Sequence, residues 1–310
     1  MAERLSVTGP DHGPWASVWA TAQQTQPVQR RGRYVPESLA HPARMLPAIA
    51  AHAIAAYTRH GDIVLDPMCG IGTTVVEAMH AGRDGVGVEY EARWADLADA
   101  NIRHTLAAGV LGRGMAVRGD GTRLTAMLPQ HLHGQVSLVV TSPPYGPTVH
   151  GHVRPSKGGV AKSSHTYGDP DADRGNLAFQ SQGQLVEAFT QILRGCRVLL
   201  KPGGVAVITA RPYRVGGDLI DLPSAVISAG LDAGLTPVER CVALLAGVRD
   251  GRLIARPSFF QLNAVRRARQ AGVPLHLIVH EDVLVLANPH PDGQLRLPAS
   301  LSARTPETPS

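Results

Sequence analysis

Residues 63–74 read Ile63-Val64-Leu65-Asp66-Pro67-Met68-Cys69-Gly70-Ile71-Gly72-Thr73-Thr74. A short β-branched run followed by two glycines and two threonines predicts a buried strand, a tight turn and a helix. Gly70 and Gly72 let the backbone approach a ligand closely. The helix that begins at Thr73 or Thr74 would point its free N–H groups at that ligand. A glycine turn after a strand is a weak signal alone, so its meaning depends on the strands that follow.

The next three predicted strands also end in polar residues. The second ends at Glu89, about 20 residues further on, where an acid can bind ribose hydroxyls. The third ends at Asp120, which suits an adenine amino group, and the fourth ends in Thr141-Ser142-Pro143-Pro144-Tyr145. Glu89 alone could instead cap the following helix, and Asp120 could be a turn or cap residue. Together, the four strand ends favour a ligand that contains a nucleoside.

The fourth strand end carries two consecutive prolines. Pro143 and Pro144 remove two backbone donors and stop the strand. Ser142 before them and Tyr145 after them are thereby held at the edge of the sheet, as a clamp for a flat polar ring would require. An ordinary surface turn also explains the two prolines.

Seven predicted strands alternate with helices along the chain. The strands are Asp62–Asp66, Gly85–Tyr90, Gly114–Arg118, Val136–Thr141, Gly204–Thr209, Val238–Leu245 and His276–Leu286. The helices are Pro47–Arg59, Thr73–Ala81, Ala92–Ala107, Arg123–Leu128, Gln184–Leu200, Leu222–Ala233 and Gln261–Ala271. This alternation implies an α/β fold with a mostly parallel sheet covered on both faces. Ligands of such sheets bind beyond the carboxyl ends of the strands, near the switch point.

The composition changes at both ends of the chain. Residues 1–35 are basic, rich in Gln, Pro, Gly and Arg, and lack periodicity, which predicts a flexible extension, although Trp15 and Trp19 could anchor it to another part of the chain. Residues 36–297 are expected to form one domain, and the Ser/Thr/Pro-rich residues 298–310 a disordered tail. A long loop at about 146–182 follows Tyr145, and a loop of that length usually has a function.

The overall composition is that of an ordinary soluble globular protein. The 310 residues are 44% hydrophobic and 18% charged, and no apolar run is long enough to span a bilayer. Met1–Leu5 lacks the apolar core of a secretory signal, and Cys69, Cys196 and Cys241 suit reduced thiols, so we expect a cytoplasmic protein without membrane contact. The cysteines lack a zinc-binding spacing. His131 with His133, and His150 with His152, have a spacing that can bind metal in a strand, but neither pair has an acid or cysteine cluster beside it, so no metal site is expected.

The positive charge is clustered. The net charge is +5, with arginine clusters at 30–33 and 266–269 and a basic stretch after Tyr145. Such segments favour polyanions such as nucleic acid, although each could simply form a solvated surface. The candidate nucleic-acid contacts are Arg154, Lys157, Lys162, Arg211 and Arg214. The last two could instead pair with acids.

The two central motifs resemble those of the amino-methyltransferase family, which modifies DNA at cytosine N4 or adenine N6. Asp66–Thr74 is similar to the family's cofactor motif, Asp-Pro-Phe-x-Gly-x-Gly-Thr-Thr, with Met68 at the Phe position. Thr141–Tyr145 is similar to its catalytic motif, in the form associated with N4-cytosine DNA enzymes. His41–Pro47 resembles the segment that covers the methionine end of the cofactor, and Lys201–Gly204 the turn before the fifth strand.

The resemblance implies a single Rossmann-like class I methyltransferase domain, with a seven-stranded, mostly parallel sheet, and S-adenosylmethionine as cofactor. It implies cofactor contacts from His41, Pro42, Asp66, Pro67, Cys69, Gly70, Gly72, Thr73, Thr74, Glu89 and Asp120, with Cys69 serving as packing. It implies catalytic roles for Ser142, Pro143, Pro144 and Tyr145. Ser142 Oγ and the Pro143 carbonyl would accept the two N–H bonds of the target amine, while Tyr145 would stack on the base.

We therefore expect methyl transfer to an exocyclic amine of a DNA base, and Ser142 favours cytosine N4. N6-adenine enzymes more often have Asp or Asn at this position. RNA is an alternative partner, because tRNA guanosine-N2 methyltransferases share the fold and a Pro-Pro-Tyr motif. A non-enzymatic module that binds the cofactor and nucleic acid is a further alternative. The short spacing between the motifs leaves no room for a large recognition domain there, so the enzyme could act as a homodimer or rely on the loop at about 146–182.

Overall fold

The computed structural model describes residues 16–144, 152–156, 159–163, 176–177, 182–215, 218–257 and 259–294. Two predicted site residues, Tyr145 and Lys157, and the predicted tail at 298–310 lie outside the described residues. Arg154 and Lys162 lie on strands of which only the backbone is described.

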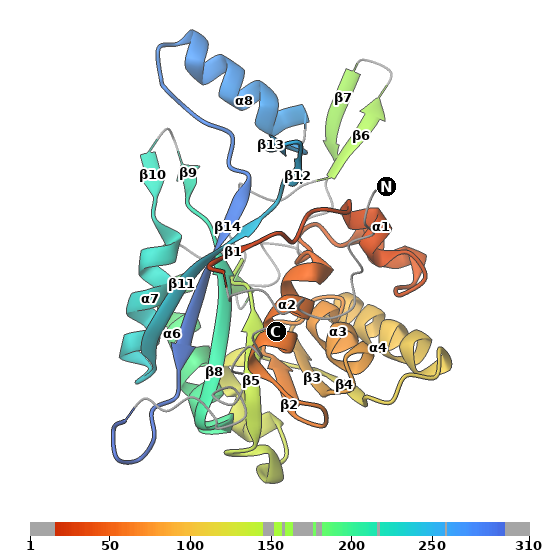
Figure 1. The fold of residues 1–310 in the computed structure, drawn as a ribbon, viewed down its shortest axis with the longest axis vertical. Helices are drawn as coiled ribbons and strands as arrows, with labels where there is room; N and C mark the ends of the chain where they lie inside the picture. The colour runs from red at the N-terminus through yellow and green to blue at the C-terminus, as the bar shows by residue number, and fades with distance from the viewer. Residues whose placement is uncertain are drawn as a thin grey trace, which may run out of the picture.

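An eight-stranded sheet forms the centre of the molecule, in the order β4-β3-β2-β5-β8-β14-β11-β1 (Figure 1). The strands are β1 (Val18–Trp19), β2 (Ile63–Asp66), β3 (Asp84–Glu89), β4 (Gly114–Arg118), β5 (Val136–Thr141), β8 (Leu200–Ala210), β11 (Thr236–Leu244) and β14 (His280–Ala287). Neighbouring strands are parallel, except that β14 is antiparallel to both β8 and β11. The switch point lies between β2 and β5, because the chain winds from β2 toward β4 on one side and from β5 toward β11 on the other.

Helices cover both faces of the sheet (Figure 1). The α-helices are α1 (Gln26–Arg30), α2 (Pro47–Tyr57), α3 (Thr73–His80), α4 (Ala92–Ala107), α5 (Leu124–Met127), α6 (Gln182–Leu199), α7 (Leu222–Asp232) and α8 (Phe259–Gln270). Short 3-10 turns are η1 (Pro36–Ala40), η2 (Gly121–Arg123) and η3 (Gln130–Leu132). Among the described residues, no helix combines the length and apolar character needed to cross a membrane.

The strands are buried on both faces, which explains their continuous apolar runs. Leu138 and Val140 of β5 pack with Ile49 and Ile54 of α2 in one core. Val139, which points to the other face, packs in a core that also contains residues of α6 and α7. The alternation of side chains along a strand thus divides the sheet between two hydrophobic cores.

The strand order confirms the predicted α/β fold with a Rossmann-like, mostly parallel sheet. All seven predicted strands form, although β14 begins at His280 rather than at His276. The sheet has eight strands instead of the predicted seven because Val18 and Trp19 pair with Val242 and Ala243 at the edge beside β11. A two-residue edge strand leaves almost no periodic signal in a sequence.

Three two-stranded hairpins lie outside the main sheet. They are β6 (His152–Ser156) with β7 (Gly159–Ser163), β9 (Tyr213–Val215) with β10 (Asp218–Ile220), and β12 (Gly247–Arg249) with β13 (Arg252–Ile254). The first lies within the segment 146–182, which the sequence predicted to be a loop. The third and α8 interrupt the chain between β11 and β14.

Residues 16–35, which the sequence predicted to belong to a flexible extension, pack against the domain. Trp19 is only 3% exposed and stacks on His52 of α2, with 4.2 Å between the ring centroids. Arg30 and Tyr34 are also buried, and the Arg30 guanidinium lies 4.5 Å from the centre of the Tyr34 ring. The aromatic rings therefore anchor a segment that lacks periodic helices of its own.

Candidate active site

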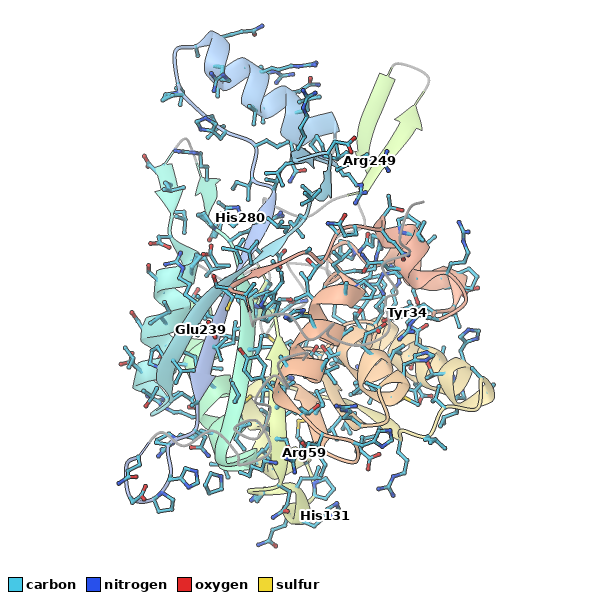
Figure 2. All side chains as sticks on the ribbon, in the orientation of Figure 1. Tyr34, Arg59, His131, Glu239, Arg249 and His280 are labelled. Carbon is cyan, nitrogen blue, oxygen red and sulfur yellow. The ribbon has the colours of Figure 1, made fainter. Side chains whose placement is uncertain are left out.

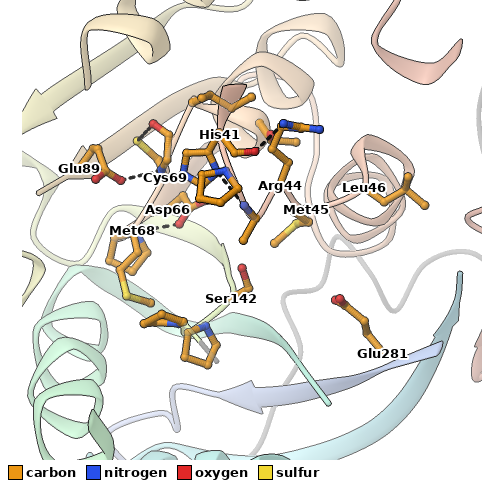
Figure 3. Close-up of a pocket in the computed structure, with 18 of the residues that line it drawn as sticks. His41, Arg44, Met45, Leu46, Asp66, Met68, Cys69, Glu89, Ser142 and Glu281 are labelled. Atoms are coloured by element: carbon orange, nitrogen blue, oxygen red, sulfur yellow. Dashed lines mark hydrogen bonds between the residues drawn. The ribbon is translucent and has the colours of Figure 1, made fainter. Parts of the chain in front are cut away.

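A cavity of about 460 Å³ lies at the carboxyl ends of the central strands (Figure 3). This volume is within the usual range for sites that bind small molecules and cofactors. The wall combines the turn after β2, the ends of β3, β4, β5 and β8, and the segment between η1 and α2. The cavity therefore occupies the switch-point position that the sequence predicts for the ligand.

Asp66 holds the first two motifs together. Its carboxylate, at the end of β2, accepts hydrogen bonds from Thr141 Oγ1 at 2.8 Å, Thr74 Oγ1 at 2.8 Å and the Met68 N–H at 3.1 Å. These bonds fix the end of β5 and the start of α3 against β2. Burial raises the pKa of Asp66 to about 6, although its three hydrogen bonds act in the opposite direction.

The glycine turn after β2 is tight because both glycines have positive φ. Gly70 has φ +54° and Gly72, the N-cap residue of α3, has φ +78°. The Cys69 N–H donates to the Val88 carbonyl of β3 at 2.9 Å, and the Cys69 side chain is buried against Gly87. The packing role predicted for Cys69 agrees with this position.

Glu89 is the carboxylate at the end of β3. It accepts the Gly70 N–H at 2.8 Å and the Glu91 N–H at 2.9 Å. It is not the N-cap of α4, because that position belongs to Glu91. Burial is the main cause that raises the pKa of Glu89 to about 7. The carboxylate therefore supports the glycine turn and lines the cavity at the same time.

Asp120 follows β4 and combines both roles that the sequence allowed. Its carboxylate accepts the Thr122 N–H at 2.9 Å and so caps η2, and the residue also lines the cavity. The next residue, Gly121, permits a close approach, since a Cβ there would lie 2.7 Å from the Pro67 carbonyl oxygen. The segments that follow β2 and β4 therefore pack closely against each other, and both line the cavity.

His41 lies over the glycine turn. A Cβ on Gly70 would lie 3.1 Å from His41 Nε2, and the His41 ring packs edge-on against Trp94 of α4, with 4.5 Å between the centroids. His41 Nδ1 accepts the Ala43 N–H at 3.2 Å. This segment forms one wall of the cavity from His41 to Leu46.

Arg30 supports this wall and was not among the predicted site residues. It is 4% exposed and donates from Nη2 to the Met45 carbonyl at 2.7 Å and to Thr73 Oγ1 at 3.1 Å. Burial lowers the pKa of Arg30, while the neighbouring Tyr34 and Glu77 oppose that shift. Its place in the arginine cluster at 30–33 suggested a solvated or anion-binding charge, and only the tertiary contacts reveal its structural position.

The Ser142 side of the cavity is formed by segments distant in sequence. Ser142, Pro143 and Pro144 follow β5, and Arg211 follows β8. Glu281 of β14 and Arg256 complete this wall. In the view of Figure 3, Glu89 lies at the left, Glu281 at the lower right, and Ser142 between them.

The structure brings most of the predicted site residues to this one cavity. The lining residues are His41, Pro42, Asp66, Pro67, Cys69, Gly70, Thr73, Glu89, Asp120, Ser142, Pro143, Pro144 and Arg211. Gly72, Thr74 and Arg214 do not line it; Gly72 caps α3, Thr74 binds Asp66, and Arg214 lies on β9. Within the described part of the chain, no cluster of three or more His, Cys, Asp or Glu side chains could hold a metal ion.

The sequence missed several lining residues besides Glu281. Ala22, Gln24, Thr25 and Gln26 come from the segment that was expected to be flexible. Asn176, with Leu177, lies within the predicted long loop, and its side-chain amide donates to Glu91 Oε1 at 2.8 Å. These residues reach the cavity through tertiary contacts, and no local motif marks them.

These residues fit a nucleoside that carries a charged amino-acid chain. Glu89 and Asp120 supply carboxylates for hydroxyl and amino donors, and Met68, Leu177 and Ile192 supply apolar wall. The backbone at Gly70 leaves room that a Cβ would fill. This combination of donors, acids and close backbone approach suits S-adenosylmethionine.

Comparison with known proteins gives matches to methyltransferases. The family model N6_N4_Mtase, described as DNA methylase, matches residues 2–100. A tRNA (guanine(10)-N2)-dimethyltransferase of Methanocaldococcus jannaschii is 30% identical over 141 residues, which are 45% of this chain and 38% of that protein. The type II methyltransferase M.MthZI of Methanothermobacter thermautotrophicus is 41% identical over 58 residues, which are 19% of this chain and 16% of that protein.

Among solved structures, TrmN from Thermus thermophilus matches with a TM-score of 0.49 and 18% identity, over 84% of this chain and 53% of that one. The matches span well under half of the length of the two curated relatives. Over residues 2–100 the chain is similar to the DNA amino-methyltransferases, and S-adenosylmethionine is the cofactor that this similarity implies.

Proposed function

We propose that this protein methylates an exocyclic amino group of a DNA base, at cytosine N4, with S-adenosylmethionine as the methyl donor. The observation that carries the proposal is that Ser142-Pro143-Pro144 line the same cavity as Asp66, Gly70 and Glu89. A catalytic turn and a cofactor turn that share one cavity can bring an amine to a bound methyl donor.

The task of the protein is mainly positioning. An aromatic amine is a poor nucleophile because its lone pair is delocalised into the ring, whereas the cofactor supplies a methyl group that is already activated. Ser142 Oγ and the Pro143 carbonyl would accept the two N–H bonds and direct the nitrogen lone pair toward the methyl group. The base must leave a duplex, or already be single-stranded, to enter the cavity.

The choice of cytosine N4 rests on Ser142. A hydroxyl at this position is typical of N4-cytosine enzymes, as its resemblance to that motif implies. The type II methyltransferase relative and the DNA methylase match support a DNA substrate for the proposal. Methylation of adenine N6 in the same cavity would require the same in-line geometry. The two reactions differ only in which base the cavity accepts.

RNA methylation is the second candidate, favoured by the tRNA (guanine(10)-N2)-dimethyltransferase relative. That match covers 141 residues, more than the 58 residues matched in the type II methyltransferase. A guanine N2 amine is also exocyclic and could use the same acceptors. The two candidates therefore differ in their nucleic acid and not in their chemistry.

Nucleoside analysis separates the candidates. The protein is incubated with labelled S-adenosylmethionine and either double-stranded DNA, single-stranded DNA or tRNA, and the nucleic acid is then digested to nucleosides. Label in N4-methylcytosine supports the proposal, and label in N6-methyladenine shows that the target is adenine N6 and not cytosine N4. Label in N2-methylguanosine supports the RNA candidate, whereas cofactor binding without transfer to any of these substrates supports a non-enzymatic module.

A further inference from the structure

The segment between β11 and β14 carries a charge out of proportion to its length. Residues 247–280 contain six arginines and one acid, Asp250, which is a net charge of +5. The whole chain also has a net charge of +5, so the rest of it contains as many acidic as basic side chains. This insertion, made of β12, β13, α8 and their connections, thus carries a net charge equal to that of the whole chain.

The insertion lies at the edge of the sheet that carries the cavity. It leaves β11 at the carboxyl end and returns through the amino end of the antiparallel β14, and both ends lie at that edge. Arg256 and Leu245 at its base line the cavity. Figure 1 shows α8 projecting beyond this end of the sheet.

Its base is fixed against the N-terminal segment that also lines the cavity. Arg256 donates through Nη1 to the Ala22 carbonyl and through Nη2 to the Gln23 carbonyl at 3.3 Å. Arg269 donates to the Leu275 carbonyl at 3.1 Å and so closes the end of α8. Arg256 and Arg269 therefore bind backbone carbonyls and have a structural role in the insertion.

The other four arginines are exposed and have no such partner within the part of the chain that the structure describes. Arg249, Arg252, Arg266 and Arg267 form no ion pair with an acidic side chain among the described residues. Arg267 lies in the last turn of α8, where its positive charge interacts favourably with the helix dipole. Arg266 and the two hairpin arginines lie outside that turn and gain no such stabilisation.

The hairpin arrangement works against stability. Arg249 pairs directly with Arg252 across the turn Asp250-Gly251, where both turn residues have positive φ. Directly opposed residues share one face of a hairpin, and like charges there are destabilising. Binding of a polyanion is a physical reason for two guanidinium groups to face the same side, since it would relieve this repulsion.

The hairpin also presents apolar side chains. Val248, Leu253 and Ile254 are 44–56% exposed. Arginines that can bind phosphates or guanine edges, combined with aliphatic side chains that can contact bases, form the mixed surface that a DNA groove accommodates.

We propose that residues 247–280 form the DNA-docking surface of the protein, with Arg249, Arg252, Arg266 and Arg267 binding the phosphate backbone of duplex DNA beside the cavity. This proposal rests on the proposed DNA substrate. It assigns a DNA-binding role to the arginine cluster at 266–269 and adds the hairpin arginines Arg249 and Arg252 to it.

The test measures affinity for a labelled DNA duplex by fluorescence anisotropy over a series of KCl concentrations. The variant is R249A/R252A/R266A/R267A in the full chain, which leaves Arg256 and Arg269 in their structural roles. The control, R59A/R194A, removes two exposed arginines, one that follows α2 and one on α6. Figure 2 shows Arg59 in the lower half of the molecule and Arg249 in the upper half. Affinity for S-adenosylmethionine, measured by calorimetry, shows whether each variant keeps its cavity.

The quadruple variant should bind DNA at least 10-fold more weakly at about 0.1 M KCl, with the slope of log K against log salt reduced by about 2 to 4. The control should stay within about 2-fold of the wild type, and all three proteins should bind the cofactor equally. Unchanged DNA affinity and slope in the quadruple variant would overturn the docking surface.

Three further outcomes are decisive. If the wild type methylates DNA while the variant keeps its DNA affinity, only the surface is wrong. If the wild type neither binds nor methylates DNA, both proposals fail. If the substitutions weaken tRNA binding alone, or change the sedimentation coefficient of the protein without changing DNA affinity, the partner is RNA or a second copy of the chain and the commitment to DNA is overturned.

Discussion

The Asp66 carboxylate accepts the Thr141 hydroxyl at 2.8 Å and so joins the two motifs that define the site. Asp66 begins the cofactor turn, and Thr141 is the last residue of β5 before Ser142. The hydrogen bond crosses between adjacent parallel strands at the switch point. The position of the catalytic turn therefore depends on a residue of the cofactor motif.

Removing this hydroxyl should destabilise the protein. T141V deprives a buried carboxylate of a hydrogen bond, and the expected cost is about 1–3 kcal/mol of unfolding free energy. T209V is a matched control, because Thr209 on the neighbouring β8 is also fully buried, yet its hydroxyl has no hydrogen-bond partner among the described residues. T209V should be neutral or stabilising, as judged by urea denaturation. Equal loss in both variants would contradict the role given to Asp66.

A methyl group at Gly70 should disrupt the cofactor cavity. The new Cβ would lie 3.1 Å from His41 Nε2, and Gly70 has φ +54°. We expect G70A to weaken S-adenosylmethionine binding at least 10-fold, measured by calorimetry. G61A controls for backbone strain, because Gly61 has φ +80° but no atom within 4 Å of a built Cβ. G61A should lose about 1 kcal/mol of stability and retain cofactor affinity. Equal affinity in G70A and G61A would rule out a ligand at this turn.

The buried Glu89 should make the ligand-free protein less stable as pH rises. Its pKa is about 7 in the folded protein and near 4.5 when unfolded, so the folded state binds more protons between these values. The stabilisation that protonated Glu89 gives to the folded state is lost as the pH rises from 5 to 8, and the loss amounts to about 3 kcal/mol of unfolding free energy. Burial lowers the pKa of His52 and His80, which opposes this trend below about pH 6.5.

The difference between the wild type and E89Q therefore isolates Glu89. The stability of the wild type relative to E89Q should fall from pH 5 to pH 8 in denaturant titrations. A difference that is constant with pH would mean that Glu89 is ionised over the whole range and that burial does not control it.

The sequence predicted the strands and the first half of the site because these depend on local pattern. Asp66, Glu89 and Asp120 each follow a β-rich run, and parallel strands bring their carboxyl ends to one edge. Turn chemistry at Gly70 and Gly72 was also visible, since positive φ is a property that glycine tolerates best.

Glu281 could not be found in the same way. It lies at the amino end of β14, and that end reaches the cavity only because β14 runs antiparallel to its neighbours. A sequence analysis that looks for polar residues at the carboxyl ends of strands does not find Glu281. Arg30 is a second example, because its burial depends on Tyr34, Thr73 and Met45, which lie in three separate segments of the chain.

The most direct test of the account is single-turnover methyl transfer by S142A at saturating S-adenosylmethionine, with the affinity for the cofactor measured on the same protein. Ser142 is expected to orient the amine without holding the cofactor. The rate should therefore fall by about 100-fold while cofactor affinity is unchanged. A rate equal to that of the wild type, with the cofactor fully bound, would contradict the central claim that the Ser142-Pro143-Pro144 turn holds the target amine.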